Sequence, residues 1–179
     1  MSYTEIYGFN SRGECEWMAE IRNAWRGAMA VWQDLEKRYL TPVRYGTRLL
    51  SFRNDTSKEV WELFYDPRLS ETERIVMGTT LDNVLVRASD ATRILEAFRA
   101  YPGETNLKKQ ADAIEQLCAD GDCTAIGWNQ TSVSGDTWAN AGGFDEEKDE
   151  SIPYNFLTMD KHWWLFDEEG RLPEKEDEE

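Results

Sequence analysis

Apolar and polar side chains alternate with a period of two at the start of the chain. Over residues 3–9, the side chains at odd positions and those at even positions form two sets that alternate along the chain. Cys15 and Trp17 alternate with glutamates. A period of two is typical of β-strands. Segment 10–13 ends in Gly13, which tolerates the backbone angles of a tight turn. The pattern predicts an N-terminal β-hairpin.

Helical spacing of apolar side chains follows the hairpin. It predicts helices over 23–40, 57–65, 70–79, 90–101 and 107–118. In the first of these, Trp25 and Trp32 lie seven residues apart on one face, so we expect both in the core. Ser70 and Glu73 have the spacing of a capping box at a helix start. The last two helices are expected to pack antiparallel.

Segments rich in β-branched and aromatic residues predict further strands over 83–87, 123–130, 152–157 and 162–166. Glycine and serine around Trp138 predict one or two hairpins within 131–143. Segment 41–55 fits either a short strand or a covered loop. Strands bracket helices, so the fold class is α+β, with a mixed or antiparallel sheet packed against four to five helices. We expect one domain over 1–170 and an acidic disordered tail over 171–179.

The chain has 179 residues, of which 40% are hydrophobic and 12% aromatic, enough for a core of its own. It has neither an apolar run of about 18 residues nor the charge pattern of a signal peptide. We therefore expect a soluble protein in the cytoplasm, with no membrane partner. The three cysteines do not form a disulfide framework.

Negative charge is concentrated at the C-terminal end. Residues 144–179 hold fourteen acidic side chains against four basic ones, which gives −10 of the whole chain's −15. Two clusters stand out: Asp145, Glu146, Glu147, Asp149 and Glu150, and then Asp167, Glu168 and Glu169. If the strands between them pair, the clusters join into one anionic ridge. Such a ridge repels nucleic acid and attracts proteins that bind it.

The sequence assigns no catalytic residue, metal or cofactor. His162 is the single histidine, which excludes mechanisms that use two imidazoles and most zinc sites. Cys118 and Cys123 lack the spacing of metal or redox pairs, and we expect both in the core. Carboxylate-dependent hydrolysis of nucleic acid or sugar is the least favoured function, because no basic groove accompanies the acidic residues.

Four segments of the chain, 23–32, 78–82, 127–138 and 162–166, resemble an uncharacterised family of small acidic proteins from phages and mobile elements of Gram-positive bacteria. That family has no known reaction, so the resemblance transfers no catalytic residues. The resemblance implies an origin in phages or mobile elements. Small acidic proteins from such elements are similar in size and charge to anti-CRISPR and anti-restriction inhibitors.

Two functions therefore compete. The favoured hypothesis is a non-enzymatic inhibitor whose two acidic clusters mimic nucleic acid and bind a basic, nucleic-acid-binding defence protein of the host, with Cas9 as one candidate. This protein would not bind nucleic acid directly. The alternative is a small-ligand or nucleotide-binding module with a polar and aromatic pocket. That pocket would consist of Trp128, Asn129, Gln130, Trp138 and His162. The oligomeric state stays open.

Overall fold

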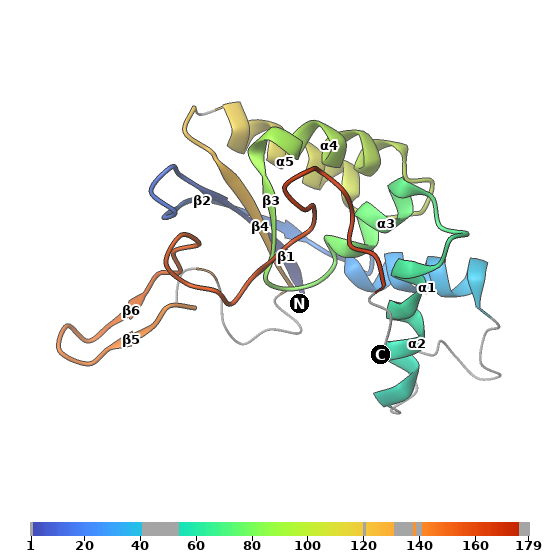
Figure 1. Ribbon diagram of the computed structural model, residues 1–179, viewed down its shortest axis with the longest axis horizontal. Helices are drawn as coiled ribbons and strands as arrows, with labels where there is room; N and C mark the ends of the chain where they lie inside the picture. The colour runs from blue at the N-terminus through green and yellow to red at the C-terminus, as the bar shows by residue number, and fades with distance from the viewer. Residues whose placement is uncertain (1, 41–53, 120, 131–137, 139–140, 176–179) are drawn as a thin grey trace.

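A five-stranded mixed sheet with helices on one face organises the protein (Figure 1). The computed structural model describes residues 2–40, 54–119, 121–130, 138 and 141–175. The segment predicted as strand or loop over 41–55 lies almost entirely outside the described residues, as does most of the region around Trp138. The predicted α+β class is confirmed.

The sheet has the strand order β2-β1-β4-β3-β7. Its strands are β1 (Tyr3–Phe9), β2 (Cys15–Arg22), β3 (Val84–Arg87), β4 (Ala125–Gln130) and β7 (Trp163–Trp164). All neighbours are antiparallel except β3 and β7, which are parallel. The predicted N-terminal hairpin is confirmed, and Gly13 turns with φ 79°. A separate two-stranded sheet pairs β5 (Gly143–Asp145) with β6 (Glu150–Ile152).

The helices comprise α1 (Ala28–Tyr39), α2 (Asn54–Glu62), α3 (Glu71–Gly78), α4 (Ala91–Ala100) and α5 (Leu107–Ala119). Short 3-10 turns extend α2 over Leu63–Tyr65 and precede α4 over Ala88–Asp90. Helices α4 and α5 pack against each other and cover one face of the sheet (Figure 1). Asp90 does precede α4 as predicted, but its side chain makes no capping hydrogen bond.

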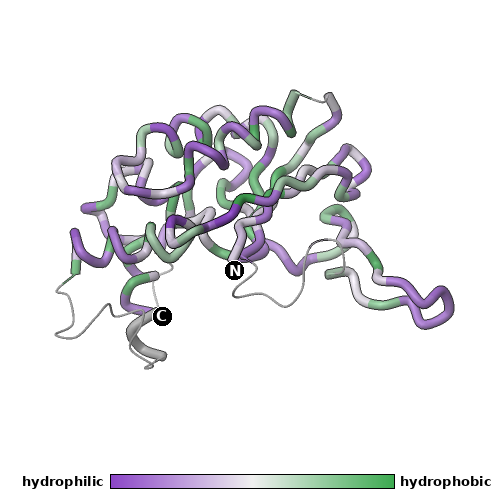
Figure 2. The backbone as a smooth tube through the Cα atoms, turned by 180° about the vertical axis from the view of Figure 1, so that it is seen from behind, coloured by the Kyte–Doolittle hydropathy of each residue, from purple (hydrophilic) through white to green (hydrophobic). Residues whose placement is uncertain are grey.

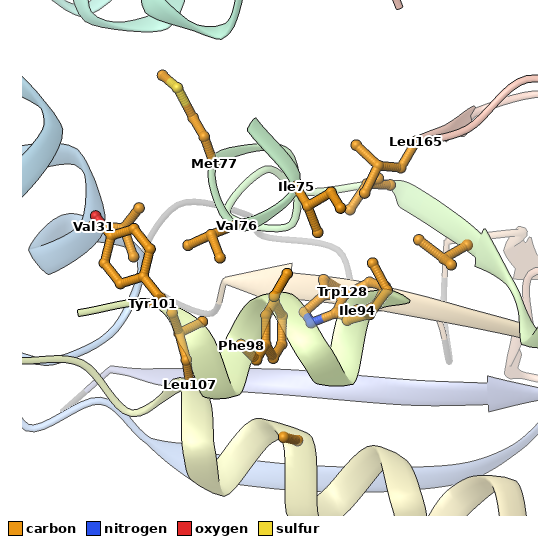
Figure 3. Packing of buried hydrophobic residues seen from close by; sticks show 14 of the residues in the cluster. Val31, Ile75, Val76, Met77, Ile94, Phe98, Tyr101, Leu107, Trp128 and Leu165 are labelled. Atoms are coloured by element: carbon orange, nitrogen blue, oxygen red, sulfur yellow. The ribbon is translucent and has the colours of Figure 1, made fainter. Parts of the chain in front are cut away.

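Both faces of the central strands are buried, because neighbouring residues of a strand point to opposite faces. On the helix face, Trp128 lies edge-on to Phe98 with ring centroids 6.3 Å apart, within the large core (Figure 3). On the opposite face, Trp138 and Tyr154 pack against Phe9. The C-terminal segment therefore supplies the second cover of the sheet.

The first predicted helix begins five residues too early. Ala24 and Trp25 have left-handed φ angles of 45° and 67°, which an α-helix cannot contain, and α1 begins only at Ala28. Trp25 is 96% exposed, so the prediction that it joins the core is wrong. Trp32 does pack against the core, and its Nε1 donates to Thr80 Oγ1 at 2.6 Å.

The residues after Gly170 follow the body of the protein as far as they are described. Leu172 packs against the core, and Arg74 Nη2 donates to the carbonyl oxygen of Pro173 at 2.5 Å. Segment 171–175 therefore has specific contacts, which an acidic disordered tail would not make. The last four residues of the predicted tail lie outside the described residues.

The predicted capping box is confirmed and is part of a larger network. Ser70 N donates to Glu73 Oε2 at 2.8 Å, and Glu73 N donates to Ser70 Oγ at 3.3 Å. Arg38 and the Tyr39 hydroxyl donate to the same carboxylate. Burial alone would raise the pKa of Glu73, but these donors outweigh burial and lower it. The Glu73 carboxylate therefore ties α1 to α3.

We predict that Glu73→Gln lowers the free energy of unfolding at pH 7 by about 1.5–3 kcal/mol, the range for hydrogen bonds to a charged group. A lowered folded-state pKa stabilises the protein above the unfolded value of 4.5, and this contribution is lost as the pH falls through the folded value. The difference between wild type and variant should therefore shrink in acid. Urea denaturation at pH 7 and pH 3 measures it, with exposed Glu62→Gln as the control. An equal difference at both pH values contradicts the assignment.

Candidate interaction surface

The β5–β6 hairpin projects from the body of the protein and has a hydrophilic tip (Figures 1 and 2). Its two strands are joined by a four-residue loop, 146–149. Asp145 Oδ1 accepts the backbone N–H groups of Glu147 at 3.0 Å and Lys148 at 3.2 Å. Asp149 closes the loop with φ 55°, a left-handed conformation that aspartate tolerates. The loop is therefore a defined turn.

The first predicted acidic cluster is brought together on this hairpin. Asp145 is half-buried and pairs with Lys148, whose Nζ lies 3.2 Å from Asp145 Oδ2. The other four carboxylates are exposed and have no ion pair with any described residue. These four are Glu146, Glu147, Asp149 and Glu150. The tip therefore presents several unneutralised negative charges within one short turn.

Two features of the hairpin oppose its own stability. Asp145 and Glu150 are directly opposite each other across the strand pair, and like charges in that position are destabilising. Phe144 is 57% exposed and Ile152 36% exposed, so apolar surface faces water beside the charges. Both features are costs in the free protein.

The hairpin is fixed at its base to the second face of the sheet. Tyr154 N donates to the carbonyl oxygen of Trp138 at 2.9 Å, and Gly142 N donates to that of Ile152 at 3.0 Å. The Trp138 and Tyr154 rings lie 4.9 Å apart, and both side chains are buried. The acidic turn is thus mounted on packed aromatic residues.

The second predicted acidic cluster lies elsewhere and does not join the first. It follows β7, which pairs with β3, whereas β6 pairs with β5, so the strands between the clusters do not pair. Arg171 neutralises it in part, with Nε 2.7 Å from Asp167 Oδ2 and Nη2 2.6 Å from Glu169 Oε2. Figure 1 separates this turn, beside α4, from the hairpin tip. The predicted single ridge does not form, and Asp167, Glu168 and Glu169 belong to a different surface.

The predicted ligand pocket is divided by the sheet. Trp128 is fully buried in the core on the helix face, whereas Trp138 belongs to the cluster on the opposite face. Trp138 Nε1 reaches only the backbone of Trp128, at 3.3 Å from its oxygen. Gln130 Oε1 accepts from Thr4, and Asn129 Nδ2 donates to Glu5 on the other side of the strand. These residues cannot line one cavity.

His162 interacts with Tyr154. Its Nδ1 lies 2.7 Å from the Tyr154 hydroxyl, and its ring lies edge-on to Trp164 with centroids 5.5 Å apart. Burial is the larger influence on its pKa and lowers it, against the opposing effect of Asp160. The histidine therefore helps to hold the aromatic cover of the sheet, and no described serine or cysteine is hydrogen-bonded to it.

Cys118, at the end of α5, and Cys123, before β4, lie beside each other against the core. The neighbouring Cys123 thiol outweighs burial and lowers the pKa of Cys118 to about 7, whereas burial raises the pKa of Cys15 to about 12. Among the described residues, no group of three or more histidine, cysteine or acidic side chains is arranged to hold a metal ion.

Sequence reasoning missed the exposed apolar side chains of Trp25 and Phe144. The spacing of seven residues between Trp25 and Trp32 predicts one helical face for both. Phe144 precedes a run of acidic residues and gives no periodic signal. The composition of residues 23–27 does contain a local signal for a turn, because asparagine and glycine bracket Trp25.

The described part of the chain contains no helix with the length and apolarity needed to cross a bilayer. Comparison with family models, with curated proteins and with solved structures finds no match. The function must therefore be inferred from the surface geometry and from the chemistry of the residues themselves.

We predict that Cys118 is the most reactive thiol at pH 7.5, because the thiolate is the nucleophile and its fraction rises above the pKa. Iodoacetamide labelling followed by peptide mass spectrometry should modify Cys118 before Cys15 and Cys123, because the pKa values of these two thiols are both raised. Cys123→Ala removes the neighbouring thiol and should move the midpoint of the Cys118 labelling profile toward the ordinary value of 9.0. A profile that is unchanged in this variant would show that Cys123 does not set the acidity of Cys118.

Proposed function

We propose that the protein is a non-enzymatic inhibitor that binds the cationic groove of a nucleic-acid-binding protein through the β5–β6 hairpin. The observation that carries the proposal is the projecting turn with four exposed, unneutralised carboxylates among the described residues. Guanidinium and ammonium groups that receive phosphates also accept carboxylates. The hairpin thus competes for the positions that nucleic acid occupies.

Electrostatic steering supports this function. The chain carries a net charge of −15, so a cationic groove attracts it over distances comparable to the Debye length of about 8 Å at physiological salt. Exposed Phe144, beside the charges, adds apolar contact area that a purely solubilising charge run does not need. Binding would combine fast association with a small apolar contact.

The resemblance to small acidic proteins of phages and mobile elements suggests the class of partner. A nucleic-acid-targeting defence protein of a bacterial host fits both that setting and the charge, and Cas9 is the first candidate to test. The acidic cluster on the hairpin alone would bind the partner, because Asp167 and Glu169 are engaged with Arg171. The pocket hypothesis has no comparable support, since its residues lie on both faces of the sheet.

We predict that the quadruple variant Glu146→Gln, Glu147→Gln, Asp149→Asn and Glu150→Gln loses inhibition of target cleavage by guide-loaded Cas9. Exposed ion pairs contribute roughly 0.2–1 kcal/mol each, so four of them correspond to about a fourfold loss of affinity or more. Titrating inhibitor into a cleavage assay at 50 and 300 mM salt measures it. Wild-type inhibition should weaken at the higher salt, because screening shortens the reach of the charges.

A second quadruple variant provides the matched control. It changes net charge by the same amount at exposed positions away from the hairpin: Glu62→Gln, Glu96→Gln, Glu104→Gln and Glu168→Gln. This control should retain inhibition. Equal loss in both variants would show that total charge matters and the hairpin does not. Full inhibition by the hairpin variant would contradict the proposed binding surface.

A further inference from the structure

The turn between β2 and α1, residues 23–27, presents the most exposed aromatic side chain among the described large hydrophobic residues. Trp25 is 96% exposed, and Met29, one helical turn further on, is 43% exposed. Ala24 and Trp25 both have left-handed φ angles, at a cost of about 1–3 kcal/mol for each such non-glycine residue. Strain of this kind persists only where surrounding structure holds it.

Buried asparagines hold the turn. Asn23 Oδ1 accepts from Thr4 Oγ1 at 2.8 Å and from Asn106 Nδ2 at 2.9 Å. Asn106 N donates to the carbonyl oxygen of Arg26 at 2.8 Å, and Arg26 N donates to that of Asn23 at 2.7 Å. The indole is therefore presented on a fixed backbone, which lowers the entropy lost on binding.

Positive side chains without ion-pair partners flank this indole in the sequence and follow Asn106, which is bonded to the turn. Among the described arginines, only Arg22 and Arg26 lack a carboxylate or carbonyl partner, and they flank Trp25. Lys108 and Lys109 are exposed two and three residues after Asn106 and also have no ion pair with described residues. Tryptophan, methionine and arginine are the side chains enriched at protein interfaces. We call Arg22, Trp25, Arg26, Met29, Lys108 and Lys109 the Trp25 surface.

The chain itself carries the complement of this surface. The β5–β6 hairpin presents four exposed carboxylates with exposed Phe144 and Ile152, against the four cations and two apolar side chains of the Trp25 surface. The hairpin and α1 extend toward opposite ends of the long axis, so the hairpin tip points away from the turn that precedes α1 (Figure 1). Contact between the two surfaces therefore requires two molecules.

We propose that the Trp25 surface binds the β5–β6 hairpin of a second copy of this chain, giving weak head-to-tail self-association. The contact is heterologous, so it grows into rings or open chains. Because the hairpin projects, it brings its local charge to the cations while the rest of the partner's acidic surface stays farther away, and salt screens that more distant charge over a Debye length of about 8 Å. A long nucleic acid would instead extend its phosphates along the acidic body of a chain with net charge −15.

Sedimentation equilibrium of the full chain from 10 µM to 1 mM tests this inference without any other protein. A contact this small belongs to the weak, micromolar-to-millimolar class. We expect the average mass to rise with concentration at 50 mM salt and to approach the monomer mass at 500 mM salt. A monomer throughout this range at 50 mM salt overturns the inference.

Two variants that are each unable to associate provide the sharper test. The first is the hairpin variant defined above, and the second combines Arg22→Gln, Trp25→Ala and Arg26→Gln. Each alone should remain monomeric with unchanged circular dichroism, because the altered side chains are exposed. Mixed in equal amounts they should form a dimer and nothing larger, since one intact surface of each kind remains. A mixture that stays monomeric, or variants that still associate alone, overturns the inference.

The second variant also separates this inference from the proposed function. It retains the intact hairpin and should still inhibit the basic partner, so loss of self-association and loss of inhibition are independent results. A fluorescein-labelled dT20 oligonucleotide is the competing probe for the Trp25 surface. Binding that needs Trp25, in a wild-type chain that stays monomeric, would assign the surface to single-stranded nucleic acid instead.

Discussion

The burial of β4 on both faces is the constraint on which the rest of the structure depends. All six residues of Ala125–Gln130 are buried, with Trp128 against the helices and the aromatic cluster of Trp138 and Tyr154 on the other face. A strand buried on both sides needs two covers. The helices supply one, and the segment after β4 supplies the other, so the acidic end of the chain is held against the sheet.

Tethering of this segment decides how its negative charge is presented. A charged tail samples many conformations and presents no fixed array of carboxylates. Here the chain enters and leaves the hairpin through Gly142 and Tyr154, whose N–H groups are bonded to defined carbonyl groups. The five acidic residues of the turn are therefore displayed from a fixed base. The second acidic cluster is also ordered, but there Asp167 accepts hydrogen bonds from Arg171 and closes a separate turn.

Local sequence signals predicted the parts of the fold whose stabilising contacts are local. The hairpin around Gly13 and the capping box of Ser70 and Glu73 depend on residues close in sequence, and both are confirmed. The strand Val84–Arg87 is also confirmed, from its β-branched composition, although its partners β4 and β7 are distant in sequence. Local patterns do not predict the turn at Trp25, because Asn106 holds it through a hydrogen bond to Asn23, 83 residues away. The helical spacing of Trp25 and Trp32 does not reflect a shared helix, because α1 begins at Ala28. No short-range sequence pattern predicts the tertiary hydrogen bond.

The acidic surface was predicted in part for the same reason. Clustering of carboxylates over 145–150 is visible in the sequence, and the structure places them on one turn. Whether this turn joins the cluster at 167–169 depends on which strands pair. Strand β6 pairs with its neighbour β5, whereas β7 joins β3 as a parallel edge strand. Alternation likewise placed Trp128 and Asn129 on opposite faces, and this divided the predicted pocket.

Amide hydrogen exchange at residue resolution tests most directly whether hydrogen bonds fix the base of the acidic hairpin to the rest of the fold. The account predicts that the N–H groups of Tyr154 and Gly142 exchange at least about 100-fold more slowly than in an unstructured peptide, because both are hydrogen-bonded at the hairpin base. The exposed loop amide of Glu146 serves as the fast-exchanging reference. Exchange of Tyr154 and Gly142 at unstructured-peptide rates would contradict the account, since the carboxylates would then belong to a loose chain.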